Sequence, residues 1–325
     1  MLRSTKPPAK PTPRGKSALA PACAGLVACA ALVVPIRVPK SVANAVKLEL
    51  SGAVWSPALS RYVLVSDDVN EAGGKHVPRL FTLSDDGKLD ATAITVLGID
   101  ELNDPESITA GPDGSLFVCT SHSINKHGNL PKSRRRLLQL ALAPDHKANI
   151  IGEVDLTTAR MADGNPPWGE RGPLDIEAIA FRDGALYIGL KSPLAADGSA
   201  TILRLPDAVS VVKSGVVPPN AISVWARAQF CVPQRGESVC EGIADLAFLP
   251  DGALLVAANS PKGMPKDGGG ALWQLSAAGT RPMLLKRFDG FKPEGVALAP
   301  DHKSAVIVFD TDGKEPIWTR WPLSP

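Results

Sequence analysis

The sequence predicts an all-β fold of the propeller class, in which one strand–turn–strand unit is repeated around an axis. Three observations predict it: a recurring pattern, the spacing of its copies, and the lack of helical periodicity. The pattern is an acidic or small residue, an apolar stretch, a Pro-Asp-Gly-like turn, and a β-rich run that ends in a polar residue. Such repetition indicates one supersecondary module packed against copies of itself. The predicted number of blades is five, with six as the alternative.

Five copies of the pattern align along the chain. The clearest begin at Glu106 and Glu177, two more begin at Ala244 and Glu294, and a degenerate copy begins at Ser51. The residues that end the five apolar runs are Asp67, Ser121, Lys191, Asn259 and Asp310. They are 54, 70, 68 and 51 residues apart, which leaves room for a four-stranded blade of roughly 40–50 residues with surface insertions. Each unit is expected to contain a hairpin, because Asp-Gly tolerates the positive φ of a tight turn.

The remaining composition agrees with one large β domain. No stretch shows a sustained helical period with caps, so little helix is expected. The chain is 44% hydrophobic, which is enough to form a sizeable core. Propellers often reach this length as a single unit, and residues 46–325 are therefore predicted to form one propeller domain.

Residues 1–45 have the layout of an export signal. They contain seven basic residues and no acidic one, and an apolar run extends from Ser17 to Ile36. Residues 43–45 (Ala-Asn-Ala) offer a small-x-small cleavage site. Residues 26–29 (Leu-Val-Ala-Cys) resemble a lipobox in which Cys29 would be lipidated, and an uncleaved anchor is the third alternative. In each case we expect an exported protein, periplasmic or extracellular, that meets a membrane only through this segment.

The charge balance depends on this leader. The whole chain has 35 basic and 33 acidic residues, but without residues 1–45 it has 28 basic against the same 33 acidic ones. The apparent basicity therefore belongs to targeting, and nucleic acid is not expected as a partner.

Three cysteines lie beyond the leader. Cys231 and Cys240 flank a short turn-rich segment and are predicted to form a disulfide in an oxidising compartment; two unpaired cysteines are the alternative. Cys119 lies in an apolar run and is expected to be a small buried side chain rather than a nucleophile. No Cys/His set has the spacing of a structural zinc site.

Several segments resemble a known family. They are Glu106–Ile108 with Thr120–Ser123 and Arg134–Leu138, Asp175–Ala180 with Tyr187–Leu194, Ala244–Gly252, and Pro293–Ala297. Together they resemble an uncharacterised bacterial propeller family related to phytase-like domains, over roughly residues 47–318. The resemblance implies a propeller fold but no established reaction. The chain also departs from the family pattern, because Gly-Leu-Arg is Gly-Leu-Lys at residues 189–191, which removes a planar guanidinium suited to bidentate anion binding.

One column of the repeat contains three carboxylates. Equivalent residues of successive blades converge at a central channel, and Glu106, Glu177 and Glu294 share this column with Ser51 and Ala244. Converging carboxylates are suited to Ca²⁺ or to acid–base catalysis through shifted pKa values. We therefore predict these three glutamates as metal ligands or catalytic residues. The alternative is that each glutamate caps its strand by bonding the backbone of the next blade.

A second ring and a basic loop supply the other candidates. The ring of predicted ligand-binding residues is Asp67, Ser121, Lys191, Asn259 and Asp310. The loop 121–136 carries five cations and two histidines, so Arg134 and Arg135 are candidate anion ligands and His122 a candidate catalytic residue. The alternatives are a solvated loop and a histidine that serves only in packing.

Two classes of function follow. The first is an exported propeller that binds an unknown small molecule or protein at its channel face. The second is a Ca²⁺-assisted hydrolase of phosphate or other esters, of phytase-like kind. Other catalytic motifs are absent from the sequence, and no cofactor besides Ca²⁺ is suggested.

Overall fold

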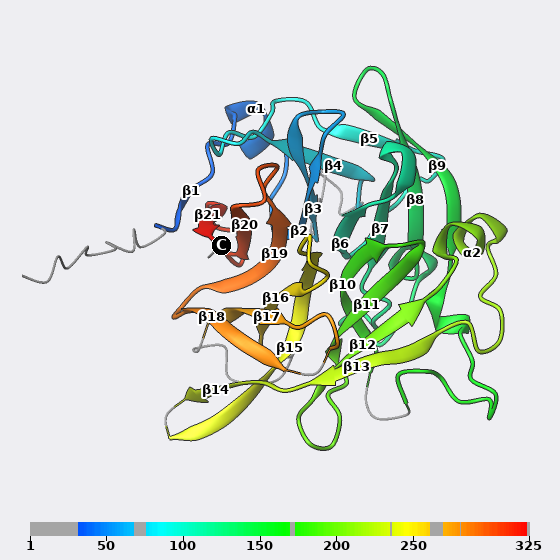
Figure 1. The fold of residues 1–325 in the computed structure, drawn as a ribbon. Coiled ribbons are helices and arrows are strands. Elements are labelled where there is room, and N and C mark those ends of the chain that lie inside the picture. Colours follow the sequence, from blue (N-terminus) through cyan, green and yellow to red (C-terminus); the bar gives the residue numbers. More distant parts are fainter. Residues whose placement is uncertain are drawn as a thin grey trace, which may run out of the picture. The chain divides into compact units, whose positions relative to one another are not determined.

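The computed structural model describes residues 32–67, 76–169, 173–234, 236–260, 269–279 and 281–323. Residues 31–325 form one compact unit, an all-β propeller as predicted (Figure 1). Within the described residues, no helix is both long and apolar enough to cross a membrane. Residues 1–31, which include Cys29 and most of the expected export signal, lie outside the described part of the chain.

The first three blades are regular four-stranded antiparallel sheets. Blade 1 contains β2 (Leu50–Ser56), β3 (Arg61–Ser66), β4 (Arg79–Leu83) and β5 (Ile94–Leu97). Blade 2 contains β6 (Pro105–Ala110), β7 (Leu116–Thr120), β8 (Leu137–Ala143) and β9 (Lys147–Val154). Blade 3 contains β10 (Asp175–Arg182), β11 (Ala185–Ser192), β12 (Ala200–Leu205) and β13 (Ser223–Ala228). Parallel pairing of β5 with β9 joins blades 1 and 2 at their outer edges.

The last two blades carry additions. Blade 4 contains β15 (Glu237–Phe248), β16 (Leu254–Asn259), β17 (Gly270–Leu275) and β18 (Pro282–Phe288), and β14 (Phe230–Gln234) pairs with the start of β15. Blade 5 contains β19 (Lys292–Leu298), β20 (Ser304–Asp310), β21 (Ile317–Pro322) and β1 (Val34–Pro35). Among the described residues the helices are short: α1 (Lys40–Ala43), α2 (Ala208–Ser214) and three 3₁₀ turns at Pro112–Gly114, Lys132–Arg134 and Leu156–Thr158.

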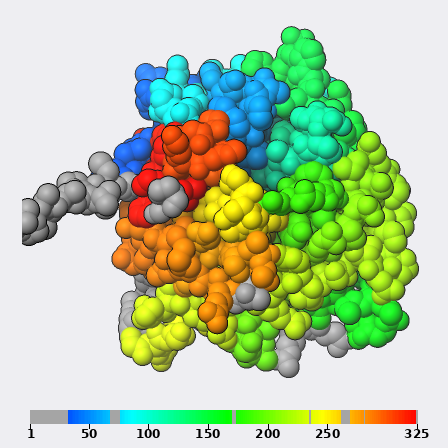
Figure 2. All heavy atoms as spheres, viewed as in Figure 1, coloured from blue at the N-terminus to red at the C-terminus, as the bar shows by residue number. Residues whose placement is uncertain are grey.

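The inner strands close a ring of five. The strands β2, β6, β10, β15 and β19 each contact the next, and β19 contacts β2 again. In the space-filling view, segments from the blue to the red end of the chain meet around the centre of the face (Figure 2). The predicted five blades are therefore confirmed.

The predicted disulfide is also confirmed. Cys231 of β14 and Cys240 of β15 are bonded and lie opposite each other in the antiparallel pair. Cys119 is a free, fully buried cysteine of β7, and burial raises the pKa of its thiol. Its surroundings agree with a packing role.

The N-terminal strand β1 closes blade 5. Val34 pairs with Trp318 and Pro35 with Ile317, and Ile36 is only 1% exposed. The propeller unit therefore begins before the boundary that we expected at residue 46. The expected cleavage after Ala45 stays a prediction, but it would remove the outermost strand of blade 5.

Every inner strand has a bulge at the same column of the repeat. The pairing register shifts at the residues Ser51, Glu106, Glu177, Ala244 and Glu294. A bulge bends its strand and redirects the neighbouring side chains. The residues that follow the bulges are Gly52, Ser107, Ala178, Asp245 and Gly295. At this level, four small residues surround one aspartate.

Glycine at this level permits the close approach of the strands. A Cβ on Gly52 would lie 2.9 Å from the carbonyl oxygen of Glu106 and from Cα of Ser107. A Cβ on Gly295 would lie 3.0 Å from Cα of Gly52. Any larger residue would push β2 away from β6 or β19.

The Asp245 carboxylate ties the blades together at this level. It is fully buried, and its oxygens accept hydrogen bonds from Ser107 Oγ and the Val296 amide, both at 2.8 Å. Ser107 Oγ in turn accepts a hydrogen bond from the Ile179 amide at 2.9 Å. Burial raises the pKa of Asp245, whereas these bonds and the backbone of Ala53 oppose the rise. One side chain thus links all five inner strands.

Replacing Asp245 is expected to destabilise the whole propeller. Asp245→Ala leaves the Val296 amide and Ser107 without their acceptor, and we expect the free energy of unfolding to fall by about 3 kcal/mol. Asp245→Asn keeps one acceptor and should lose less. Asp289→Ala, at a side chain that is 89% exposed, is the control. Denaturant titration measures all three, and a loss for Asp245→Ala no larger than that of the control would contradict the assigned role.

The N-terminal strand gives a second prediction. A chain that starts at residue 46 loses the pairing of β1 and the burial of Ile36 and Val42, which are both core residues. Because a buried aliphatic side chain contributes about 1.5–3 kcal/mol, this chain should melt several degrees below one that starts at residue 31. Equal melting temperatures would show that β1 is dispensable.

Candidate functional site

The two predicted columns meet at one end of the channel. The inner strands begin there and the second strands of the blades end there, so their terminal side chains face one another. We call this end the polar mouth. Its side chains are Asp67, Asp104, Glu106, Asp175, Glu177, Lys191, Asn259, Lys292, Glu294 and Asp310, with Arg134 behind Asp104. Seven of them are carboxylates and three, with Arg134, are cations.

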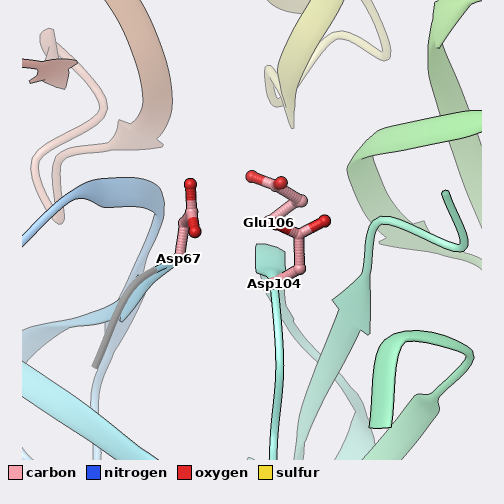
Figure 3. Close-up of side chains that lie close together, drawn as sticks. All are labelled: Asp67, Asp104 and Glu106. Carbon is pink, nitrogen blue, oxygen red and sulfur yellow. The ribbon is translucent and has the colours of Figure 1, made fainter. Parts of the chain in front are cut away.

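One side of the polar mouth is an acidic group. Each of Asp67, Asp104 and Glu106 offers a carboxylate oxygen, and these oxygens all lie within 4.8 Å of one another. Figure 3 draws the three side chains. Glu106 is 7% exposed, and within the described residues its carboxylate has neither a hydrogen bond nor an ion pair. Burial and then the charges of Asp104, Glu177 and Asp67 raise the pKa of Glu106 well above its usual range. The group therefore gains from a proton or a cation.

The other side of the polar mouth contains its own cations. Lys191 Nζ pairs with Glu177 and lies 3.3 Å from each carboxylate oxygen of Glu294. Lys292 Nζ lies 2.6 Å from Glu294 and 2.9 Å from Asp310. Three carboxylates thus share two ammonium groups.

The pKa values on this side of the polar mouth depend on burial and on the two ammonium groups that the carboxylates share. Burial opposes ionisation of Glu294, but the two lysines outweigh it and lower its pKa to about 2. Burial likewise opposes the charge of Lys191, yet Glu177 and Glu294 raise its pKa. Burial raises the pKa of Glu177, against the effect of Lys191. Of the two glutamates on this side, Glu177 is the one whose pKa is raised.

The predicted set of three glutamates is divided by this arrangement. Glu106 lies in the acidic group, whereas Lys191 lies between Glu177 and Glu294. Among the described residues, Asp67, Asp104 and Glu106 are the set whose spacing suits a metal ion. A metal-ligand role for Glu177 and Glu294 is therefore not supported by their contacts. Within the described part of the chain, the carboxylates of these two glutamates bond to lysine side chains and not to the backbone of the next blade.

The second predicted ring is placed at the polar mouth, with different surroundings for each member. Asp67 joins the acidic group, while Lys191 and Asp310 belong to the ion pairs. Asn259 is fully buried and donates through Nδ2 to the Pro293 carbonyl at 2.8 Å. Among the described residues, its Oδ1 has no hydrogen-bond partner. Ser121 Oγ accepts hydrogen bonds from Arg134 and Ser123.

The structure does not support the predicted catalytic role of His122. Its Nδ1 donates to the Thr120 carbonyl at 2.7 Å, and its Nε2 accepts from the Leu156 amide at 3.3 Å. Burial lowers the pKa of His122 to about 4, so the ring is neutral near pH 7. Both ring nitrogens are used inside the protein, which agrees with the packing alternative.

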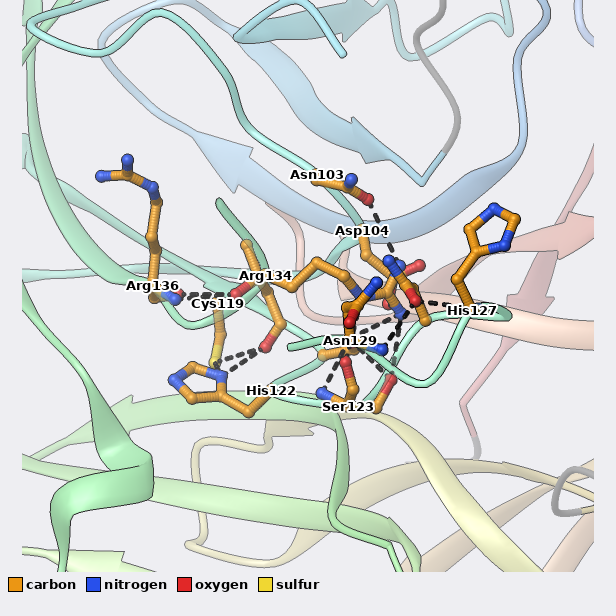
Figure 4. A network of polar contacts seen from close by, with 12 residues as sticks. Asn103, Asp104, Cys119, His122, Ser123, His127, Asn129, Arg134 and Arg136 are labelled. Atoms are coloured by element: carbon orange, nitrogen blue, oxygen red, sulfur yellow. Dashed lines mark hydrogen bonds and ion pairs between the residues drawn. The ribbon is translucent and has the colours of Figure 1, made fainter. Parts of the chain in front are cut away.

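The predicted anion ligands of the basic loop are also engaged within the protein. Arg134 pairs with Asp104 and donates to the Ser123 carbonyl at 3.0 Å and to Asn103 at 3.3 Å, a network drawn in Figure 4. Arg135 pairs with Asp155 at 2.8 Å. These guanidinium groups already pair with carboxylates of the protein, and these pairs hold the loop 121–136 in place.

Three residues of the polar mouth lie outside the two columns that the sequence predicted. Asp104, Asp175 and Lys292 each precede a glutamate of the bulge column by two residues. Side chains two residues apart lie on the same face of a strand. The spacing Asp-x-Glu or Lys-x-Glu could therefore have predicted these three residues beside the glutamates.

Comparisons with known proteins find only distant similarity. No family model and no curated protein matches the chain. A gluconolactonase from Xanthomonas campestris is 13% identical, with 91% of each chain covered and a TM-score of 0.40. A Myxococcus xanthus glutaminyl cyclase is 13% identical over 90% of this chain and 98% of its own, with a TM-score of 0.44. Such low similarity transfers no ligand or reaction. The resemblance to phytase-like proteins likewise holds only as far as the propeller fold.

The buried lysine gives a third prediction. Lys191→Met leaves Glu177 and Glu294 without the ammonium between them, and breaking a buried pair in this way costs about 3–5 kcal/mol. Adding Glu177→Gln removes one of the two carboxylates and should restore part of the loss. Denaturant titration of both variants checks this, and equal loss in the single and the double variant would contradict the ion-pair assignment.

Proposed function

We propose that the protein binds a divalent cation at Asp67, Asp104 and Glu106, with Ca²⁺ as the first candidate, and thereby holds a ligand at the channel face. The observation that carries this proposal is the buried carboxylate of Glu106. It has no partner among the described residues, and two further carboxylates lie within ligand distance of it.

The donor set suits a hard cation. Ca²⁺ takes six to eight oxygen ligands in flexible geometry, and all three side chains offer carboxylate oxygens. Asp104 also pairs with Arg134, which reduces the negative charge that faces the cation. Three carboxylates fill only part of a calcium shell, which leaves coordination positions for the oxygen atoms of a ligand. A cation also offsets the cost of burying Glu106.

Ligand binding is favoured over ester hydrolysis. A phosphatase of phytase-like kind would present cations to the phosphate, but Arg134 and Arg135 are paired with aspartates. Lys191 and Lys292 are likewise paired with carboxylates. No observation favours the hydrolase.

We also propose that the protein is exported to the periplasm or out of the cell. Residues 1–45 have the layout of a leader. The Cys231–Cys240 disulfide is of a kind that persists in oxidising compartments.

Calcium is expected to stabilise the protein through Glu106. A cation that binds only the folded state adds about 2.7 kcal/mol at 100 times its dissociation constant, so Ca²⁺ should raise the melting temperature of the chelator-treated protein. Glu106→Gln should abolish this shift. Glu177→Gln is the matched control, because Glu177 lies on the lysine side of the polar mouth and should leave the shift intact.

Two results would contradict the proposal. One is the lack of any thermal shift with Ca²⁺, Mg²⁺ or Mn²⁺. The other is a full shift in Glu106→Gln together with its loss in Glu177→Gln, which would place the cation on the opposite side of the polar mouth.

A further inference from the structure

The channel has a second mouth with a different character. At the end opposite the polar mouth, the structure contains a cavity of about 210 Å³, which we call the axial pocket. All five inner strands line it, through Ala53–Trp55, Ile108–Ala110, Phe181, Leu246–Phe248 and Val296–Leu298. Ser107, Ala178 and Asp245 are fully buried between the two mouths. The axial pocket is therefore separate from the acidic group.

Aromatic side chains form much of its wall. Trp55, Phe181 and Phe248 are each only partly buried, with part of their surface left at the pocket. Each is held by a second ring, namely Tyr62, Phe117 and Tyr187, at centroid distances of 5.0, 5.4 and 4.9 Å. The Arg182 guanidinium also lies over Phe248, 5.3 Å from the ring centroid. The aromatic walls are thus fixed before any ligand arrives, which reduces the entropy lost on binding.

The lining excludes a charged ligand. Among the described residues, no Asp, Glu, Lys or Arg side chain lines the axial pocket. Its polar side chains are His302 and Thr109, and Thr109 Oγ1 already accepts a hydrogen bond from the Phe181 amide at 3.2 Å. A charged group would lose part of its hydration there without gaining an oppositely charged Asp, Glu, Lys or Arg partner from the described lining.

The volume sets the size of the ligand. A cavity of about 150 Å³ lined by apolar side chains is enough to hold benzene, and the axial pocket is somewhat larger. We propose that it binds a neutral molecule with one six-membered ring and short substituents, packed against Trp55, Phe181 and Phe248. This site is independent of the cation site at the other mouth.

Binding of 4-fluorophenol, followed by ¹⁹F NMR, tests the proposal. This probe is neutral at pH 7 and should show saturable line broadening with the wild-type protein, whereas the charged 4-fluorobenzoate should not. Ala247→Leu places extra carbon atoms in the pocket and should weaken binding at least about tenfold. Ala91→Leu makes the same change at an exposed position of blade 1 and should leave the affinity unchanged.

Three results would each overturn the proposal. They are a lack of saturable broadening with the wild-type protein, binding of the benzoate as tight as that of the phenol, and a loss of affinity in Ala91→Leu as large as that in Ala247→Leu. If Ala247→Leu does not fold, Ala110→Leu fills the same pocket from β6. Glu106→Gln should bind the phenol like the wild type, so failure of the cation site is distinguishable from failure of this one.

Discussion

The hydrogen bonds around Asp245 are the constraint on which the rest of the propeller depends. A carboxylate buried on the axis must keep its acceptor bonds, because an unsatisfied buried polar group is costly. Its donors come from other blades, so β6 and β19 have to approach within hydrogen-bond distance of the carboxylate, and β10 has to approach Ser107 of β6. Gly52 and Gly295 make that approach sterically feasible. The ring of five is thus held by a polar interaction at its centre as well as by the apolar layers between blades.

The bulges connect this centre to the polar mouth. The bulge residue of each inner strand stands directly before the residue that lies at the height of Asp245 on the channel axis. The bulge therefore sets both the contact made on the axis and the direction of the side chain of the bulge residue. In blades 2, 3 and 5 that residue is a glutamate, which brings several carboxylates into a low-dielectric space. Lysines neutralise most of the charge on the side of Glu177 and Glu294. On the other side, the buried carboxylate of Glu106 has no hydrogen bond or ion pair within the described residues, and this supports the proposed cation.

The sequence predicted what is local and repeated. Hairpin turns, the alternation of apolar residues and the fixed columns are visible in each unit, so the fold, the five blades and the converging columns could be predicted. The Cys231–Cys240 disulfide could also be predicted, because the two cysteines are close in the chain.

What could not be predicted depends on partners distant in sequence or on a shift of register. Lys191 meets Glu294, and His122 meets the Leu156 amide, only in the folded chain. Asp245 stands one position beyond the glutamate column. Its place on the axis follows from the bulges, which no pattern in the sequence predicted. The strand β1 was assigned to the leader because the apolar run continues into it without a break.

The location of a bound cation is the most direct test of this account. An anomalous difference map from crystals grown with Ca²⁺ should show a peak about 2.3–2.6 Å from carboxylate oxygens of Asp67, Asp104 and Glu106. A map without a peak at these residues, or with a peak between Glu177 and Glu294, would contradict it.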